Sequence, residues 1–279
     1  MTTKFYYFTY FVNPINQLPL FSENRSKRDI ILAFLKKDYE YQYRKADLGY
    51  VFVDEIDGYL IAKLGRRSKI TRSLPPSQKF EEKKEESWPH CLMIINTNED
   101  PNDGQKIAFE YKNSIFRSPQ HQLKVFADEL NGRLLGNGYV ISINSITDQE
   151  NFWDVARRYE GRIEKLTFTF NAPNLFKLKD TLNTELKDAQ RVYSITKATF
   201  GLENADGKLT IPQGNEFLKQ GVEYVSAGGG EYQLRVRAKG KININSSKNT
   251  KTKNFDKLEI DYLGRDKKQL LNILKQIFE

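Results

Sequence analysis

The pattern of apolar and polar residues predicts a strand-rich first half. The run Lys4–Val12 is dense in Phe and Tyr and stops at Asn13–Pro14, which is typical of a strand followed by a turn. Asp57–Gly58 separates two short apolar runs, and this dipeptide favours a hairpin. Residues 65–89 interrupt the pattern with Pro75–Pro76 and a mixed-charge run that lacks an apolar period. We therefore expect a mobile loop or a solvated helix over residues 65–89.

Helical spacing begins at Ser118–Pro119, where the serine suits an N-cap and the proline suits a first turn. Apolar residues then recur every three or four positions until the glycines at 136 and 138 end the helix, and a second, short helix is expected over Gln149–Arg158. The second half alternates more clearly. Its predicted strands lie at 163–170, 191–200, 232–238, 241–245 and 258–262, and its helices start at Pro173, Gln213 and Arg265.

These elements predict an α+β fold with antiparallel or mixed sheets and helices packed on one face. The order of strands and helices after residue 163 favours split βαβ units, the ferredoxin-like plan, over a doubly wound parallel sheet. A chain of 279 residues has room for two regions. We expect a strand-rich N-terminal region at 1–158 and a C-terminal ferredoxin-like region with a basic surface at 159–279.

Positive charge is clustered toward the end of the chain. The net charge is +8, and residues 231–279 contain twelve Lys or Arg against six Asp or Glu. A second cluster, Lys63–Arg72, contains no acidic residue. Clusters of this kind are typical of nucleic-acid binding, although surplus surface charge also serves solubility.

The segment Ser226–Lys241 combines three glycines with a row of cations at alternate positions. Alternation in a strand places the cations on one face and the apolar residues on the other. Glycine amides next to such a row suit a phosphate backbone; the alternative is a helix C-cap that turns into a solvent-facing edge strand. The predicted contacts are Gly228, Gly229, Gly230, Arg235, Arg237, Lys239, Lys241, Lys248, Lys251, Lys253, Arg66 and Arg67.

The order helix, glycine triplet, strand over Ser226–Val236 resembles the glycine loop of the repeat-associated RNA-binding proteins of bacterial CRISPR systems, but that family's histidine and further glycines are absent. The resemblance implies RNA or single-stranded nucleic acid as the ligand. The triplet forms neither a dinucleotide-binding fingerprint nor a Walker loop, so no nucleotide cofactor is expected.

Other chemistry is sparse. Glu110 and Lys112 have the E-x-K spacing of metal-dependent nucleases, with Asp103 upstream, and they are the best enzymatic candidates. The single cysteine, Cys91, excludes an internal disulfide and a cysteine-based zinc site and is expected to be a small buried residue. No signal peptide or membrane-spanning run is recognisable, which predicts a cytoplasmic protein without a membrane partner.

The sequence thus predicts a nucleic-acid-binding component, for RNA or single-stranded DNA, of a bacterial system, with antiviral defence as the expected setting. No cofactor is expected. The expected partners are nucleic acid and protein subunits of a larger complex. Two alternatives remain. One is a nuclease that holds a divalent metal near Glu110, Lys112 and Asp103, and the other is a protein-interaction subunit of a defence or toxin complex.

Overall fold

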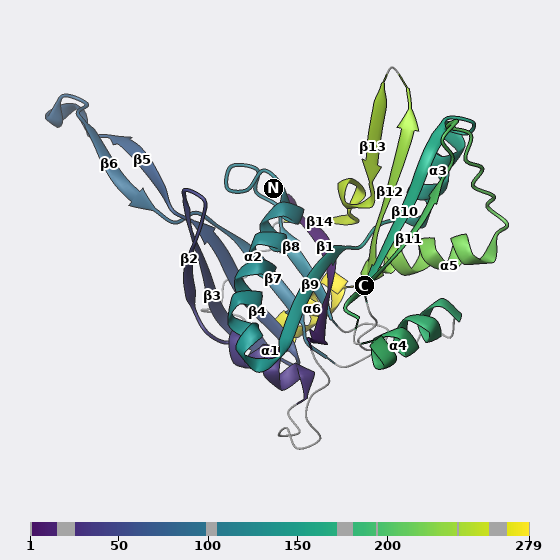
Figure 1. Cartoon of the computed structure of the whole chain (residues 1–279). Helices are drawn as coiled ribbons and strands as arrows, with labels where there is room; N and C mark the ends of the chain where they lie inside the picture. Colours follow the sequence, from purple (N-terminus) through teal and green to yellow (C-terminus); the bar gives the residue numbers. More distant parts are fainter. Residues whose placement is uncertain are drawn as a thin grey trace.

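The computed structural model describes residues 2–15, 26–98, 105–171, 181–193, 195–238, 240–256 and 267–278, which form two lobes (Figure 1). Each lobe is built on its own sheet, and a separate hairpin projects from the first lobe. The predicted α+β class with antiparallel sheets is confirmed. Among the described helices, none is long and apolar enough to cross a lipid bilayer.

Strands dominate the first half of the chain, and helices and strands alternate in the second. In chain order, the first twelve elements are β1 (Thr2–Pro14), α1 (Lys27–Leu35), β2 (Tyr39–Tyr43), β3 (Ala46–Ile56), β4 (Tyr59–Arg66), β5 (Ser68–Ser73), β6 (Glu82–Ser87), β7 (His90–Asn96), β8 (Lys106–Glu110), α2 (Pro119–Leu134), β9 (Tyr139–Ser145) and α3 (Gln149–Arg158). The others are β10 (Ile163–Asn171), α4 (Thr181–Tyr193), β11 (Lys197–Glu203), α5 (Glu216–Tyr224), β12 (Gly230–Arg237), β13 (Lys241–Asn245), β14 (Thr252–Asp256) and α6 (Lys267–Phe278).

The large sheet of the first lobe is organised around β1. Its strand order is β14-β1-β8-β7-β4-β3-β2, and β9 also pairs with β1. Residues 2–6 of β1 pair with β14 and residues 8–14 pair with β9, whereas β8 pairs with residues 5–9 on the other side. β9 and β14 therefore lie end to end along one edge of β1.

Both faces of the large sheet are buried. Phe8 and Tyr10 of β1 pack in the core that contains α1 and α2, whereas Phe5 and Tyr7 pack on the opposite face against α6. The Tyr7 hydroxyl donates a 2.6 Å hydrogen bond to the carbonyl of Ile277 in α6. The prediction of helices on one face only is wrong for this sheet, because β1 carries large apolar side chains at both odd and even positions.

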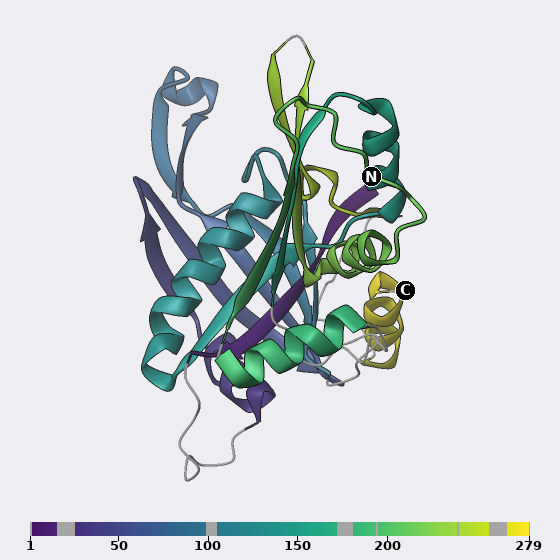
Figure 2. The ribbon, with the colours of Figure 1, turned by 45° about the vertical axis from the view of Figure 1, so that its right-hand side comes forward.

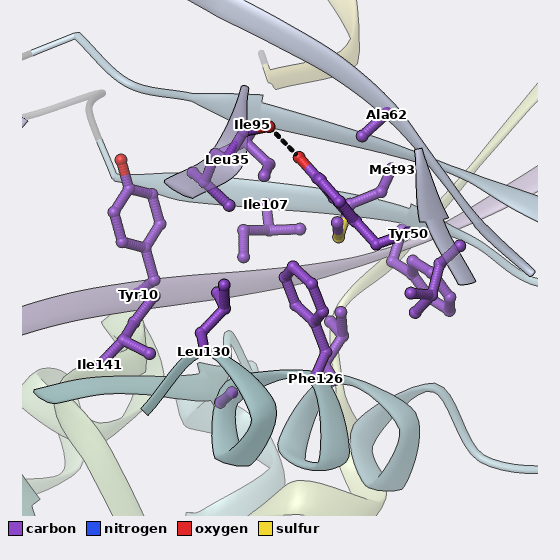
Figure 3. Packing of buried hydrophobic residues seen from close by; sticks show 14 of the residues in the cluster. Tyr10, Leu35, Tyr50, Ala62, Met93, Ile95, Ile107, Phe126, Leu130 and Ile141 are labelled. Carbon is purple, nitrogen blue, oxygen red and sulfur yellow. Dashed lines mark hydrogen bonds between the residues drawn. The ribbon is translucent and has the colours of Figure 1, made fainter. Parts of the chain in front are cut away.

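Tyr50 of β3 anchors α1 and α2 on the sheet (Figure 3). Its ring stacks on Phe126 of α2 with centroids 4.9 Å apart, and its hydroxyl donates a 2.7 Å hydrogen bond to the carbonyl of Leu35 in α1. A buried tyrosine whose hydroxyl keeps a hydrogen-bond partner avoids the cost of an unsatisfied polar group and packs as a rigid ring. Cys91 is buried in the same core, as predicted. These contacts fix the axis of α2, and with it the place of the helix N-terminus.

The second lobe has a four-stranded antiparallel sheet in the order β11-β10-β12-β13. Its inner face packs on helices: Phe152 of α3 lies 4.9 Å from the ring of Tyr232, and Leu218 and Val222 of α5 join the same core. Alternate residues of β12 are buried and the intervening ones face outward, which confirms the predicted alternation.

The ferredoxin-like prediction is not confirmed. A split βαβ unit places the two strands that flank a helix in parallel, with another strand between them. In this protein β10 and β11 flank α4 in the sequence, yet they are direct neighbours and run antiparallel. β11 and β12, which flank α5, lie on either side of β10 and are parallel to each other, so among the described strands of this sheet only this pair has the split arrangement.

The two lobes do not follow the order of the chain. α3 contributes Phe152 and Trp153 to the core of the second lobe, whereas β14 and α6 return to the first lobe. The chain leaves and re-enters the first lobe at one point, where the Lys251 amide donates a 2.7 Å hydrogen bond to the carbonyl of Ile146. The second lobe is thus inserted between β9 and β14, an arrangement that no local sequence pattern reveals.

Short-range features of the chain follow the sequence pattern in some places and depart from it in others. Asp57 and Gly58 form a two-residue turn with φ of 49° and 78°, and the Ser118 hydroxyl accepts a 3.2 Å hydrogen bond from the His121 amide, so the hairpin and the cap are confirmed. Within residues 65–89, residues 68–87 instead form the antiparallel β5–β6 hairpin, which has no core beneath it and hence no apolar period. The strand expected at 191–200 begins only at Lys197, because α4 runs to Tyr193. The predicted strand 258–262 and the helix start at Pro173 lie outside the described residues.

Candidate nucleic-acid interface

The glycine triplet lies in the interior, between the two lobes. A Cβ atom on Gly228 would come within 2.4 Å of the Thr9 hydroxyl, and one on Gly230 would lie 2.0 Å from the carbonyl oxygen of Thr169. Gly228 also has φ of +87°, which favours glycine. The triplet is therefore required for close packing of the chain on itself, and the structure does not present it as an open phosphate loop.

The cations of β12 face solvent but are paired with carboxylates. The Glu164 carboxylate lies 3.0 Å from Nε of Arg235 and 2.5 Å from Nε of Arg237, although its own side chain is only 4% exposed. The register of β10 shifts between Ile163 and Lys165, and such a bulge redirects the side chain at the shift. Glu164 is thereby placed beneath the arginines that were predicted to meet phosphates.

A second carboxylate completes this cluster, which we call the outer-face network. Glu203 of β11 lies 2.7 Å from Arg235 and 2.9 Å from Lys165, and the ammonium of Lys241 lies 3.6 Å from Glu164. A hydrogen bond from Arg237 holds the pKa of Glu164 below its usual value, and Lys165 does the same for Glu203. The network comprises Glu164, Lys165, Glu203, Arg235, Arg237 and Lys241.

Arg237 has a further structural role. Its guanidinium donates hydrogen bonds of 3.2 Å and 2.7 Å to the carbonyls of Asp206 and Ala205, in the loop that follows β11. With Glu164 on its Nε, each of its three guanidinium nitrogens makes a hydrogen bond within the chain. Arg237 therefore ties β12 to β10 and to the loop after β11, and its charge is paired with Glu164.

The other predicted cations have different surroundings. Arg67 is paired with Asp47 and Glu86, and the Lys253 ammonium donates a 3.1 Å hydrogen bond to the Gln276 carbonyl in the last turn of α6. Lys251 is exposed beside the junction between the lobes, where its amide and carbonyl bond Ile146 and Tyr7. Lys239 lies outside the described residues.

The residues of the nuclease alternative are not gathered into a metal site within the described chain. Glu110 accepts a 2.8 Å hydrogen bond from the Leu92 amide and lies 2.8 Å from the Lys112 ammonium, so both groups stabilise the β7–β8 pair. Asp103 lies outside the described residues. Among the residues that are described, no three His, Cys, Asp or Glu side chains converge as metal ligands would.

A different basic surface surrounds the N-terminus of α2. Two cavities of about 290 and 400 Å³ meet there, because Arg117 and Ser118 line both of them. We call the surface that they form together the α2 groove. Its cationic side chains come from four separate parts of the chain: Arg44, Lys45, Arg66, Arg117 and Lys248.

The cations of the α2 groove are not neutralised by neighbours. No acidic residue appears among the described residues that line either cavity. All five cations are exposed, and none forms an ion pair with a residue in the described ranges. Arg44 adopts φ of +55° in the two-residue turn between β2 and β3, a conformation that is uncommon for a bulky residue. The N-terminal end of the α2 dipole adds positive potential at the centre of the groove.

Aromatic side chains lie between these cations. The rings of Tyr6 and Tyr111 line one cavity with centroids 5.3 Å apart, and Tyr43 and His121 line the other with centroids 5.5 Å apart. The Arg44 guanidinium lies 5.3 Å from the centre of the Tyr43 ring. All four rings retain some exposure, in contrast to Tyr41 and Tyr59, which are buried in the cores.

Comparisons with known proteins do not assign this surface a role. No family model matches the chain, and neither a curated protein nor a solved structure is significantly similar to it.

Sequence reasoning identified two of the five groove cations, Arg66 and Lys248, and missed the other three. Arg44 and Lys45 form a two-residue turn between β2 and β3, where Asn-Gly or Asp-Gly is common. Two cations at such a turn are unusual, and this would have marked them as candidate binding residues. Arg117 directly precedes the Ser118–Pro119 cap, so the sequence also places a cation at a helix N-terminus, where anions bind. Their meeting with Lys248 depends on the return of the chain to the first lobe.

Proposed function

We propose that this protein binds single-stranded nucleic acid through the α2 groove. The observation that carries the proposal is the set of five exposed cations, Arg44, Lys45, Arg66, Arg117 and Lys248, which face a groove without a lining carboxylate among its described residues. Cations left without internal partners are free to neutralise phosphates and release their counterions. This is the chemistry predicted from the composition, now based on different residues from those of the glycine segment.

The aromatic residues of the groove favour an unpaired strand over a duplex. Bases in a single strand expose their faces, and stacking on a tyrosine or histidine contributes about 1–3 kcal/mol per base. Tyr43 and Tyr111 lie beside the groove cations in separate cavities, which suits a strand whose phosphates and bases contact alternate groups. In a duplex the base faces are stacked on one another, so the aromatic rings of the groove would find no face to stack on.

Charge reversal in the groove tests the proposal. The double variant Arg44→Glu/Arg117→Glu should weaken binding of a fluorescent single-stranded oligonucleotide at least about 100-fold in anisotropy titrations at fixed salt, because two phosphate contacts become repulsive. Melting curves should confirm that the variant folds.

The matched control is Lys208→Glu/Lys219→Glu, which changes the net charge equally at two exposed residues of the second lobe. It should weaken binding only slightly. An equal loss in both double variants would show that overall charge, and not the α2 groove, determines affinity, and the proposal would be rejected. The proposal would also be rejected if the wild-type protein bound none of the oligonucleotides tested.

The predicted setting, a bacterial antiviral system, belongs to the same proposal. Phage challenge of cells that express the wild-type chain or the Arg44→Glu/Arg117→Glu variant tests it, since protection should require an intact groove.

A further inference from the structure

A third cavity, the interlobe cleft, opens beside the α2 groove. Its volume is about 430 Å³, and Ser118, Gln120 and Ser247 line both the cleft and the groove. Its lining residues come from α2 and β9 on one side and from β11, β12 and the 3-10 helix Ser246–Asn249 on the other, so both lobes contribute. The ribbons of the two lobes lie beside each other in Figure 2. The volume lies within the range of about 300–1,000 Å³ that is usual for small-ligand sites.

The cleft differs from the groove in its charges. Two cations, Lys124 and Lys197, and two carboxylates, Asp128 and Glu231, line it. None of these four side chains forms an ion pair with any residue in the described part of the chain. The side-chain amide nitrogen of Asn144, another lining residue, is buried and has no hydrogen-bond partner there. The cleft therefore offers unused donors and unused acceptors together.

This combination suits a nucleoside better than a phosphate. Carboxylates repel a phosphate, but they accept hydrogen bonds from ribose hydroxyls, as the acidic residue of dinucleotide-binding folds does. Lysine and asparagine donors can contact the acceptor edges of a base, and part of the cleft is lined by Ile141 and Ala127, which are apolar. The 2′-hydroxyl is the group that distinguishes RNA from DNA at such a site.

We propose that the interlobe cleft holds one nucleotide of an RNA strand whose neighbouring phosphates lie in the α2 groove, with Asp128 or Glu231 accepting a hydrogen bond from its 2′-hydroxyl. This inference rests on the proposed function and narrows its ligand to RNA. The groove supplies sequence-independent affinity, and the cleft supplies the discrimination between the two sugars.

The test compares one sequence as RNA, DNA and 2′-O-methyl RNA in anisotropy titrations. The wild-type protein should bind RNA about tenfold or more tightly than the other two, because a hydroxyl that donates to a carboxylate is lost in both. In Asp128→Ala/Glu231→Ala, which removes both acceptors, this ratio should fall to about twofold or less, while the affinity for DNA stays equal or rises. The matched control, Glu160→Ala/Glu223→Ala, removes two exposed carboxylates elsewhere and should keep the ratio.

The outcomes separate the two proposals. Equal binding of RNA and DNA by the wild type, with loss of both in Arg44→Glu/Arg117→Glu, would overturn the cleft inference and leave the proposed function intact. A tenfold preference that persists in Asp128→Ala/Glu231→Ala would also overturn it. If none of the three oligonucleotides binds, the proposed function fails and this inference fails with it.

Discussion

Two basic regions of this molecule contain similar numbers of cations but differ in what surrounds them. In the outer-face network, Lys165, Arg235, Arg237 and Lys241 surround the carboxylates of Glu164 and Glu203. In the α2 groove, five cations line cavities whose described lining includes no carboxylate. The network uses its charges to hold β10, β11, β12 and β13 together, and the groove leaves its charges available.

The difference shows why a count of charges along the sequence overestimates the positive charge that the second lobe can offer to a ligand. A phosphate that approaches Arg235 or Arg237 must either displace Glu164 or accept its repulsion, and the remaining positive charge of the network is shared among four side chains. Glu164 and Arg237 are 73 positions apart in the sequence, and pairing over such a separation has no signature in the local pattern. The groove obtains its potential from the absence of such partners among the described residues that line it.

The largest effect is expected where the glycine triplet meets the rest of the chain. Gly230→Ala would place a Cβ 2.0 Å from the Thr169 carbonyl oxygen and 3.1 Å from the Phe170 Cα, main-chain atoms that cannot rotate away. The free energy of unfolding in urea should fall by about 3 kcal/mol or more, at or beyond the usual cost of overpacking.

Gly214→Ala is the control, since a Cβ there meets nothing within 4 Å, and its stability should be unchanged or higher by up to about 1 kcal/mol. If Gly230→Ala keeps wild-type stability but loses affinity for nucleic acid, the triplet belongs to the binding site. The second lobe, and not the α2 groove, would then be the region that binds.

A smaller effect is expected from opening the outer-face network. The pKa of Glu164 is lowered from its ordinary value of 4.5, mainly by the hydrogen bond from Arg237. Because the folded pKa is the lower one, the stabilisation from this carboxylate is present above pH 4.5 and is lost as the pH falls through the folded pKa. Glu164→Gln should therefore lower the melting temperature at pH 7 and flatten its decline below pH 4.5.

The same variant tests whether the network conceals a binding site. Glu164→Gln leaves Arg235 and Arg237 without their shared carboxylate, so a latent phosphate site would gain affinity. We expect the affinity for a single-stranded oligonucleotide to match that of Glu160→Gln, which removes one exposed carboxylate elsewhere. A gain of about tenfold over this control would mean that both basic regions bind.

The parts of the fold that depend on neighbouring residues were predictable from the sequence. Asp57–Gly58, the Ser118 cap and the alternation of β12 each depend on a few adjacent residues, and all three are confirmed. The alternative interpretation of the glycines was a helix C-cap that turns into a solvent-facing edge strand. The order α5, Gly228, β12 matches the helix end and the turn, but β12 is not an edge strand, because β10 and β13 flank it. Local conformational preference determines these features, so a single sequence contains them.

The candidate site was less accessible for a physical reason. The cations of the α2 groove are spread along the chain from Arg44 to Lys248, and they meet only because β14 pairs with β1 after the insertion of the second lobe. Long-range pairing also placed Glu164 under the arginines of β12. The clustering of cations in the sequence therefore predicted the same type of chemistry that we propose for the groove. For Arg235 and Arg237, however, it indicated a surface whose charges are already paired.

The smallest expected effect separates two neighbouring residues that sequence alone treats as equal. Arg66 lines the α2 groove without an ion pair to any described residue, whereas Arg67 is held by Asp47 and Glu86. If pairing determines which cations bind, Arg66→Gln should reduce the slope of log affinity against log salt by about 0.7, the value for one phosphate of a single strand. Arg67→Gln should leave the slope unchanged between about 50 and 300 mM salt, because a cation paired with carboxylates neutralises no phosphate and so releases no counterion from the nucleic acid. Equal reductions in the two variants would show that proximity in the sequence, and not the ion pairs, governs this surface.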